Sequence, residues 1–229
     1  LTNANGIIYT GIQTYYGSGF ENVPDGEYTL KVTSGSCTNT MVVALGEATK
    51  AVAAMGQLAA DNFARGAEQL AGYDESAISE IDRVEDELDQ FADSADHFLI
   101  GLSKSIENEA EDRQLDMLMQ SVPNFERVGD YATNFMEFAQ KMNAENAEFS
   151  EGARKELQVI CNAVNEILTI TVEAFNAGDN EYAKQIEPLE ETIDDMVMML
   201  RDRHTKRLKK GDCSVDVGLI FMEALTHLE

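Results

Sequence analysis

Basic side chains are scarce in this sequence. Its 229 residues include 17 Lys and Arg against 42 Asp and Glu, which gives a formal net charge of -25 at pH 7. The average field of such a chain repels nucleic acid and anionic membrane surfaces, and it attracts divalent cations and basic protein surfaces. We therefore expect no nucleic-acid partner, and we expect a metal ion or a basic protein surface instead.

Long apolar runs and cysteine clusters are also missing. The apolar stretches reach only a few residues, whereas a bilayer-spanning helix needs about 20, so any membrane part is expected outside this chain. The first residue is Leu and no cleavage signal follows, which indicates a fragment boundary. Cys37, Cys161 and Cys213 are odd in number, far apart and without metal-type spacing, which indicates a reducing, cytoplasmic setting.

Residues 1–40 differ in composition from the rest of the chain. They are rich in Gly, Thr and Tyr, and a Pro-Asp-Gly turn at 24–26 precedes the alternating residues Tyr28, Leu30 and Val32. This pattern predicts a short β-rich or irregular segment that is too small to bury a core alone. A linker, a hairpin laid on the helices and a segment foreign to the main domain are the alternatives left open.

From about residue 44 onward, apolar residues recur with the spacing of amphipathic helices. In one such helix the predicted buried stripe runs from Ile78 to Leu102 and includes Phe98. Farther along, Met196, Met198 and Met199 are interpreted as core residues of another stripe. Breaks rich in Gly, Asn and acidic residues divide this part of the chain into six helices.

The six helices are two copies of three. Residues 55–74 resemble residues 160–179, and the remaining helices align at nearly the same offset. Short connections predict that each copy is an antiparallel three-helix bundle. We therefore expect an all-α fold of two tandem bundles, at residues 41–145 and 146–229, with the second truncated in its last helix.

Pairs of carboxylates with the spacing Glu-x-x-x-Asp recur at equivalent places in the two copies. The two side chains of a pair lie one helical turn apart on one face, about 6 Å along the axis, where they repel unless a cation lies there. Oxygen ligands on neighbouring helices could hold Mg, Mn, Fe or Zn. Taken alone, the pattern is better explained by a solvated acidic surface. The positions are Glu85/Asp89, Glu190/Asp194 and Glu126/Asp130, with Asn134 one turn after the last pair.

Two segments carry a family resemblance. Residues 125–134, FERVGDYATN, resemble the signature of the phosphate-uptake regulator (PhoU) family, and residues 81–89, IDRVEDELD, resemble its acidic second-helix motif. The likeness covers residues 44–229 in the right order and spacing. It implies two three-helix bundles whose Glu-x-x-x-Asp motifs bind metal ions, including multinuclear clusters.

Carried over residue by residue, the resemblance implies two metal sites for divalent or trivalent ions such as Fe, Zn, Mn or Mg. The chain ends where the second Arg-x-Gly-Asp motif would begin, so the second site is expected to be incomplete. The first site consists of Glu85, Asp89, Glu126 and Asp130, with Asn134 beside it, and the second of Glu190, Asp194 and Glu229.

The sequence departs from the family pattern at three positions. Pro123 and Pro188 shortly precede the acidic motifs, where a proline inside a helix costs about 3 kcal/mol and bends it. Tyr131 stands where many relatives have His, which removes a nitrogen ligand or a supporting group.

The function is expected from the same resemblance. Residues 39–48 resemble the entry to the first helix in the cytosolic domain of bacterial sodium–phosphate cotransporters. We expect a non-enzymatic cytoplasmic domain that limits phosphate uptake by docking to a membrane transporter domain or transport machinery, at the inner face of the membrane, and that can form a homodimer. One alternative is a stand-alone PhoU-type regulator of a phosphate ABC transporter and its sensor kinase. Another is a metal-dependent helical-bundle enzyme, whose Glu-x-x-His pairs are missing here.

Overall fold

The computed structural model describes residues 2–3, 28–29 and 40–229, and the chain divides into two units at residue 44. In the first unit, strand β1 (Thr2–Asn3) pairs antiparallel with β2 (Tyr28–Thr29). The predicted strand is thus present at Tyr28, whereas Leu30 and Val32 lie outside the described residues.

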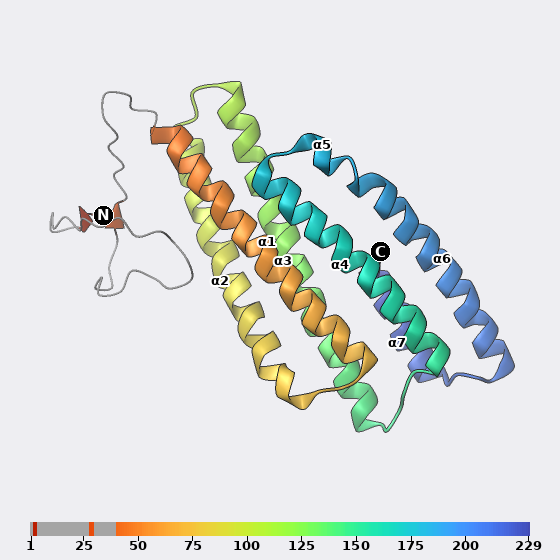
Figure 1. The fold of residues 1–229 in the computed structure, drawn as a ribbon. Coiled ribbons are helices and arrows are strands. Elements are labelled where there is room, and N and C mark those ends of the chain that lie inside the picture. The colour runs from red at the N-terminus through yellow and green to blue at the C-terminus, as the bar shows by residue number, and fades with distance from the viewer. Residues whose placement is uncertain (1, 4–27, 30–39) are drawn as a thin grey trace. The chain divides into compact units, whose positions relative to one another are not determined.

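The helices form two antiparallel three-helix bundles in tandem (Figure 1). The all-α fold expected from the sequence is confirmed. Among the described residues, no helix combines the length and the apolar composition that crossing a bilayer requires. The first bundle contains α1 (Thr40–Ala71), the short 3-10 helix η1 (Glu75–Ala77), α2 (Ile78–Ser103) and α3 (Glu109–Ala144), and the second contains α4 (Glu151–Ala177), the short α5 (Asn180–Ala183), α6 (Ile186–Lys210) and α7 (Val215–Leu228).

Local signals set the ends of these helices. The side chain of Asn108 accepts hydrogen bonds from the first backbone N–H groups of α3, and Ser150 and Ser214 do the same for α4 and α7. Gly178 and Gly211 end α4 and α6 with φ of 62° and 77°, in the left-handed region that favours glycine. These ends coincide with the breaks predicted from the sequence.

One apolar core joins the two bundles. Phe63 of α1 and Phe135 of α3 are at most 1% exposed, and their rings meet edge to face with centroids 5.5 Å apart. The same cluster of buried side chains continues through Leu157 of α4 and Val197 of α6 to Phe221 of α7. The repeats are therefore not independent lobes, because α3 contributes to a core that α4, α6 and α7 complete.

Three side chains interpreted as core residues are exposed. Phe98 is 47% exposed, Met198 64% and Met199 45%. On α2 the buried side chain near this point is Leu99. One residue turns a helix by about 100°, so a shift of one position in the stripe carries a side chain from the core to the surface. The prediction that these three residues are buried was wrong.

The two prolines differ in their position within the helices. Pro123 lies inside α3, which continues through it, and its exposed ring faces away from the core. Pro188 is the third residue of α6. The N–H groups of a first turn have no helical partner, so a proline costs little there. The penalty expected from the sequence therefore applies to Pro123 alone.

The closest helix crossing supplies a first prediction. A Cβ atom at Gly66 of α1 would lie 2.5 Å from Cα and 2.6 Å from the carbonyl O of Ala132 in α3. We expect Gly66→Ala to lower the free energy of unfolding by about 1–3 kcal/mol, because two backbones must separate. Gly46→Ala, with nothing within 4 Å of its Cβ, is the matched control and should raise stability by about 0.5–1 kcal/mol. Urea unfolding midpoints measure both, and an unchanged midpoint for Gly66→Ala would contradict the crossing.

Candidate metal centre

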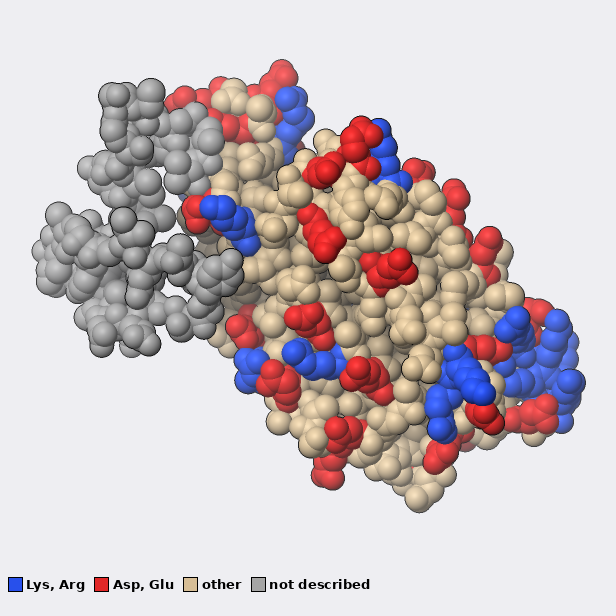
Figure 2. Space-filling view, in the orientation of Figure 1, with Lys and Arg blue, Asp and Glu red and all other residues tan. Residues whose placement is uncertain are grey.

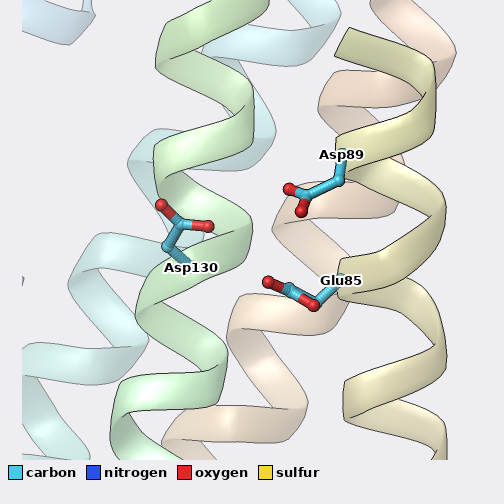
Figure 3. Close-up of side chains that lie close together, drawn as sticks. All are labelled: Glu85, Asp89 and Asp130. Atoms are coloured by element: carbon cyan, nitrogen blue, oxygen red, sulfur yellow. The ribbon is translucent and has the colours of Figure 1, made fainter. Parts of the chain in front are cut away.

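Three carboxylates from two helices meet in the first bundle. Glu85 and Asp89 lie one turn apart on α2, and Asp130 faces them from α3. Each offers an oxygen within 4.8 Å of the others. Figure 3 shows Glu85 and Asp89 extending from α2 toward α3, which carries Asp130. The structure thus brings together three of the four residues expected in the first site.

A glycine lets α3 approach α2 closely enough for these carboxylates to converge. Gly129 precedes Asp130, and a Cβ atom there would lie 2.4 Å from Cδ1 of Leu88, the residue before Asp89. Helix α3 can approach α2 at this level only because position 129 has no side chain. Gly129 was not singled out as a positioning residue in the sequence, although it lies inside the motif that carries the family resemblance.

Burial and neighbouring negative charges raise the pKa values of Glu85, Glu126 and Asp130. Burial is the main cause of the raised pKa of Glu85, and the negative charge of Asp89 is the next. The pKa of Asp130 is also raised by burial and by Asp89, and Arg127 opposes the shift. For Glu126 the causes of the raised pKa are burial, then Asp130, then Asp89. These carboxyl groups therefore lose their protons less readily than in water, since each new charge meets others close by.

Glu126 and Asn134 flank the three converging carboxylates. Glu126 is half-buried one turn before Asp130 on α3 and feels the charges of the cluster, but it is not one of the three that converge. Asn134 is half-buried one turn after Asp130. Both lie on the helix face that carries Asp130, so they stay candidate ligands or supporting groups.

The carboxylates expected in the second metal site do not converge as those of the first bundle do. Within residues 40–229, the three converging carboxylates of the first bundle are the only such group of three or more that the structure brings together. Glu190 is exposed and Asp194 half-buried on α6. Glu229 instead accepts a hydrogen bond from Nη2 of Arg201, with an N–O distance of 2.7 Å. The second site therefore stays a prediction without a matching arrangement.

Tyr131 has a packing role. Its ring lies 4.8 Å from that of His227 on α7, measured between centroids, and Phe138 lies 5.7 Å from the same imidazole. Burial lowers the pKa of His227. The residue that departs from the family pattern thus packs at the contact between α3 and α7, and His227 belongs to an aromatic group.

The donor set of the cluster fits a hard or borderline cation. All three groups are carboxylates, which suit Mg and Mn as well as Fe, and Zn also accepts carboxylate oxygen. The side chains are partly exposed, so an ion can reach them from solvent. A bound cation would offset the repulsion that the raised pKa values record.

Comparison with known proteins assigns the family. The family described as PhoU domain matches residues 52–139 and 157–229, once in each bundle. The chain belongs to the PhoU family. The resemblance read from the acidic motifs is therefore confirmed.

Solved structures agree with this fold. PhoU from Pseudomonas aeruginosa superposes with a TM-score of 0.76 at 19% identity, covering 82% of this chain and 90% of that one. The phosphate transport system regulatory protein PhoU from Streptococcus pneumoniae gives a TM-score of 0.73 at 18% identity, covering 82% and 88%. No curated protein matches the chain. At 19% and 18% identity, these two matches establish the fold of the chain and nothing further.

The raised pKa values predict a pH dependence for the metal-free protein. A carboxyl group whose pKa is higher in the folded than in the unfolded state holds its proton more tightly when folded, so stability falls as pH rises through that interval. We expect Glu85→Gln/Asp130→Asn to be more stable than the original chain at pH 7. The difference should close as the pH falls below about 4, the ordinary carboxyl pKa, because the groups are then protonated in both states. Thermal unfolding with chelator present measures it, with Glu137→Gln, an exposed acid on α3, as control.

Metal binding supplies a separate prediction. Elemental analysis of the purified chain should find stoichiometric metal, and adding Mg, Mn, Fe or Zn should raise the melting temperature, since an ion that binds only the folded state stabilises it. Glu85→Gln/Asp130→Asn should lose both effects, and Glu137→Gln should keep them. Testing Glu126→Gln alone decides whether that residue is a ligand. Equal metal content in the double variant and the original chain would place the ion elsewhere.

Proposed function

We propose that this chain is a non-enzymatic regulatory domain that limits phosphate uptake by docking to transport machinery at the inner face of the membrane. The observation that supports it most directly is the match of the PhoU family to both bundles. A solved relative with the same fold is described as a phosphate transport system regulatory protein. In this proposal residues 41–145 and 146–229 are the two repeats, and residues 1–40 form a separate segment.

The finer proposal is the cytosolic domain of a sodium–phosphate cotransporter. The support is the sequence of residues 39–48, at the start of α1, which resembles the corresponding entry in such domains. A stand-alone regulator of a phosphate ABC transporter and its sensor kinase is the competing assignment. The two assignments share the same fold. They differ in the transporter that is regulated, which is driven by sodium in the first and by ATP in the second.

The carboxylate cluster supplies the metal part of the proposal. Glu85, Asp89 and Asp130 come from two helices, so an ion held by them would tie α2 to α3, with Glu126 and Asn134 as neighbouring oxygen donors. The ion would supply positive charge where the chain has three converging negative groups. Glu190, Asp194 and Glu229 are proposed as part of a second site, which rests on the resemblance between the repeats.

Uptake measurements test the function. In the native host, phosphate uptake at high external phosphate should rise when the region encoding this chain is removed, because the restraint is lost. If the increase disappears when choline replaces sodium, the cotransporter assignment holds. An increase that needs ATP and not sodium would support the stand-alone regulator. Unchanged uptake in both conditions would contradict a regulatory role.

A matched variant connects the site to the function. Glu85→Gln/Asp130→Asn should reproduce part of the increase in uptake if the metal-binding cluster takes part in regulation, and Glu137→Gln should not. Equal amounts of each chain, measured by immunoblot, exclude loss through degradation. A double variant that restrains uptake as well as the original chain would separate the cluster from regulation.

A further inference from the structure

Basic side chains gather at one end of the second bundle. The last ten residues of α6 carry six of the 17 Lys and Arg of the whole chain. Figure 2 shows these blue side chains massed at the end of the bundle where α6 stops, against scattered charges on the rest of the visible face. The six are Arg201, Arg203, Lys206, Arg207, Lys209 and Lys210.

Ion pairs neutralise only part of this positive charge. Arg203 and Arg207 share one carboxylate, that of Glu156 on α4, at N–O distances of 3.3 and 2.6 Å. Arg201 pairs with Glu229 and Lys206 with Asp202. Lys209 and Lys210 are exposed and form no ion pair among the described residues. Cations in a last turn also complement the helix dipole, which explains their sign but not the apolar side chains beside them.

Exposed apolar side chains adjoin the cations. Leu208 is 37% exposed, and across the connection to α7 Val215 is 69% and Leu219 59% exposed. Val215 and Leu219 are four residues apart, so they lie on one face of α7. A Cβ atom at Gly218 would lie 3.2 Å from Cδ2 of Leu208, so Leu208 packs against α7 at Gly218. We call residues 201–219 the α6–α7 corner.

We infer that the α6–α7 corner is a contact surface for an anionic lipid bilayer. Clusters of Lys and Arg on an amphipathic helix are typical of segments that bind anionic headgroups. Neighbouring apolar side chains can enter the boundary between headgroups and acyl chains. The flexible, unpaired Lys209 and Lys210 would meet lipid phosphates while Val215 and Leu219 enter that boundary. The inference deepens the proposed docking at the inner face of the membrane and rests on it for its biological setting.

The net charge of the chain does not oppose this contact. The corner contains six basic side chains and three acidic ones, Asp202, Asp212 and Asp216. With Glu156 and Glu229, which pair with its arginines, the local charge is 6 - 5 = +1, and the rest of the chain carries -25 - 1 = -26. At physiological salt, charges are screened beyond about 8 Å. Only side chains next to the bilayer therefore contribute, and the acidic remainder of the chain is screened from the lipid.

Vesicle binding by the purified full chain tests the inference. The chain should sediment with vesicles of phosphatidylcholine and phosphatidylglycerol but not with phosphatidylcholine alone, and salt should release it. Lys209→Glu/Lys210→Glu should lower binding by about tenfold or more, since each basic side chain near an anionic surface contributes roughly a factor of five. Val215→Ser/Leu219→Ser should weaken binding without removing its salt dependence.

Matched variants elsewhere control for charge and hydrophobicity. Lys104→Glu/Lys141→Glu makes the same change in net charge at exposed positions of the first bundle, and Val159→Ser removes a side chain that is 59% exposed on α4. Both should bind as the original chain does. Because the chain contains no Trp, Leu219→Trp gives a single fluorescent reporter, whose emission should shift to the blue with anionic vesicles.

The outcomes separate the possible ligands of the corner. Absence of sedimentation, equal binding to neutral vesicles, or full binding by Lys209→Glu/Lys210→Glu would overturn the inference. Binding to an acidic polypeptide such as poly-glutamate, but not to vesicles, would overturn it in favour of a protein partner. Millimolar inorganic phosphate that abolishes sedimentation at constant ionic strength would identify free phosphate as the ligand instead. The assay contains no transporter and no phosphate flux, so its failure is distinguishable from failure of the uptake experiments.

Discussion

The structure depends on how closely α3 can approach its two neighbours in the first bundle. Helix α1 has a glycine, Gly66, where the backbone of Ala132 passes. Helix α3 has a glycine, Gly129, where the side chain of Leu88 on α2 packs. These contacts on α3 are only three residues apart, so one short stretch of helix touches both neighbours. Close packing of this kind tolerates little added volume, and it holds the face of α3 around Asp130 against α2.

The acidic cluster is a consequence of that approach. Asp130 lies between the two contacts in sequence, and the packing that buries Leu88 carries Asp130 toward Glu85 and Asp89. The fold thereby holds like charges together, and the pKa values of Glu85 and Asp130 are raised first by burial and then by the negative charge of Asp89. Groups held in an unfavourable environment by the rest of a fold are a sign of a binding role, and a cation is the ligand that would relieve this one.

The second bundle repeats the architecture without repeating this chemistry. Its core is continuous with that of the first bundle through Phe135 and Phe221, but Glu229 is engaged by Arg201. Its distinctive feature is the positive α6–α7 corner. The two repeats thus place an acidic cluster and a basic corner at different parts of one continuous core, and the proposed metal site and the proposed lipid contact are separate surfaces of one chain.

Much of the fold was predictable because its signals are local. Helix ends follow from residues such as Asn108 and Gly211, whose side chain or left-handed backbone acts within four residues. The repeat and the spacing of acids on each helix are also properties of neighbouring residues. The sequence by itself therefore determined the helices, their two-fold repetition and the candidate ligands.

Only the tertiary structure decided which candidates meet. Glu126 and Asp130 have the same spacing as Glu85 and Asp89, yet three of these four converge, because the distance between α2 and α3 is set by contacts such as that of Gly129. It also decided that Phe98 faces solvent, since the buried face of a helix is chosen by the helices that pack against it. The periodicity of apolar residues defines the apolar face of each helix. The distances between helices depend on contacts between residues far apart in the chain.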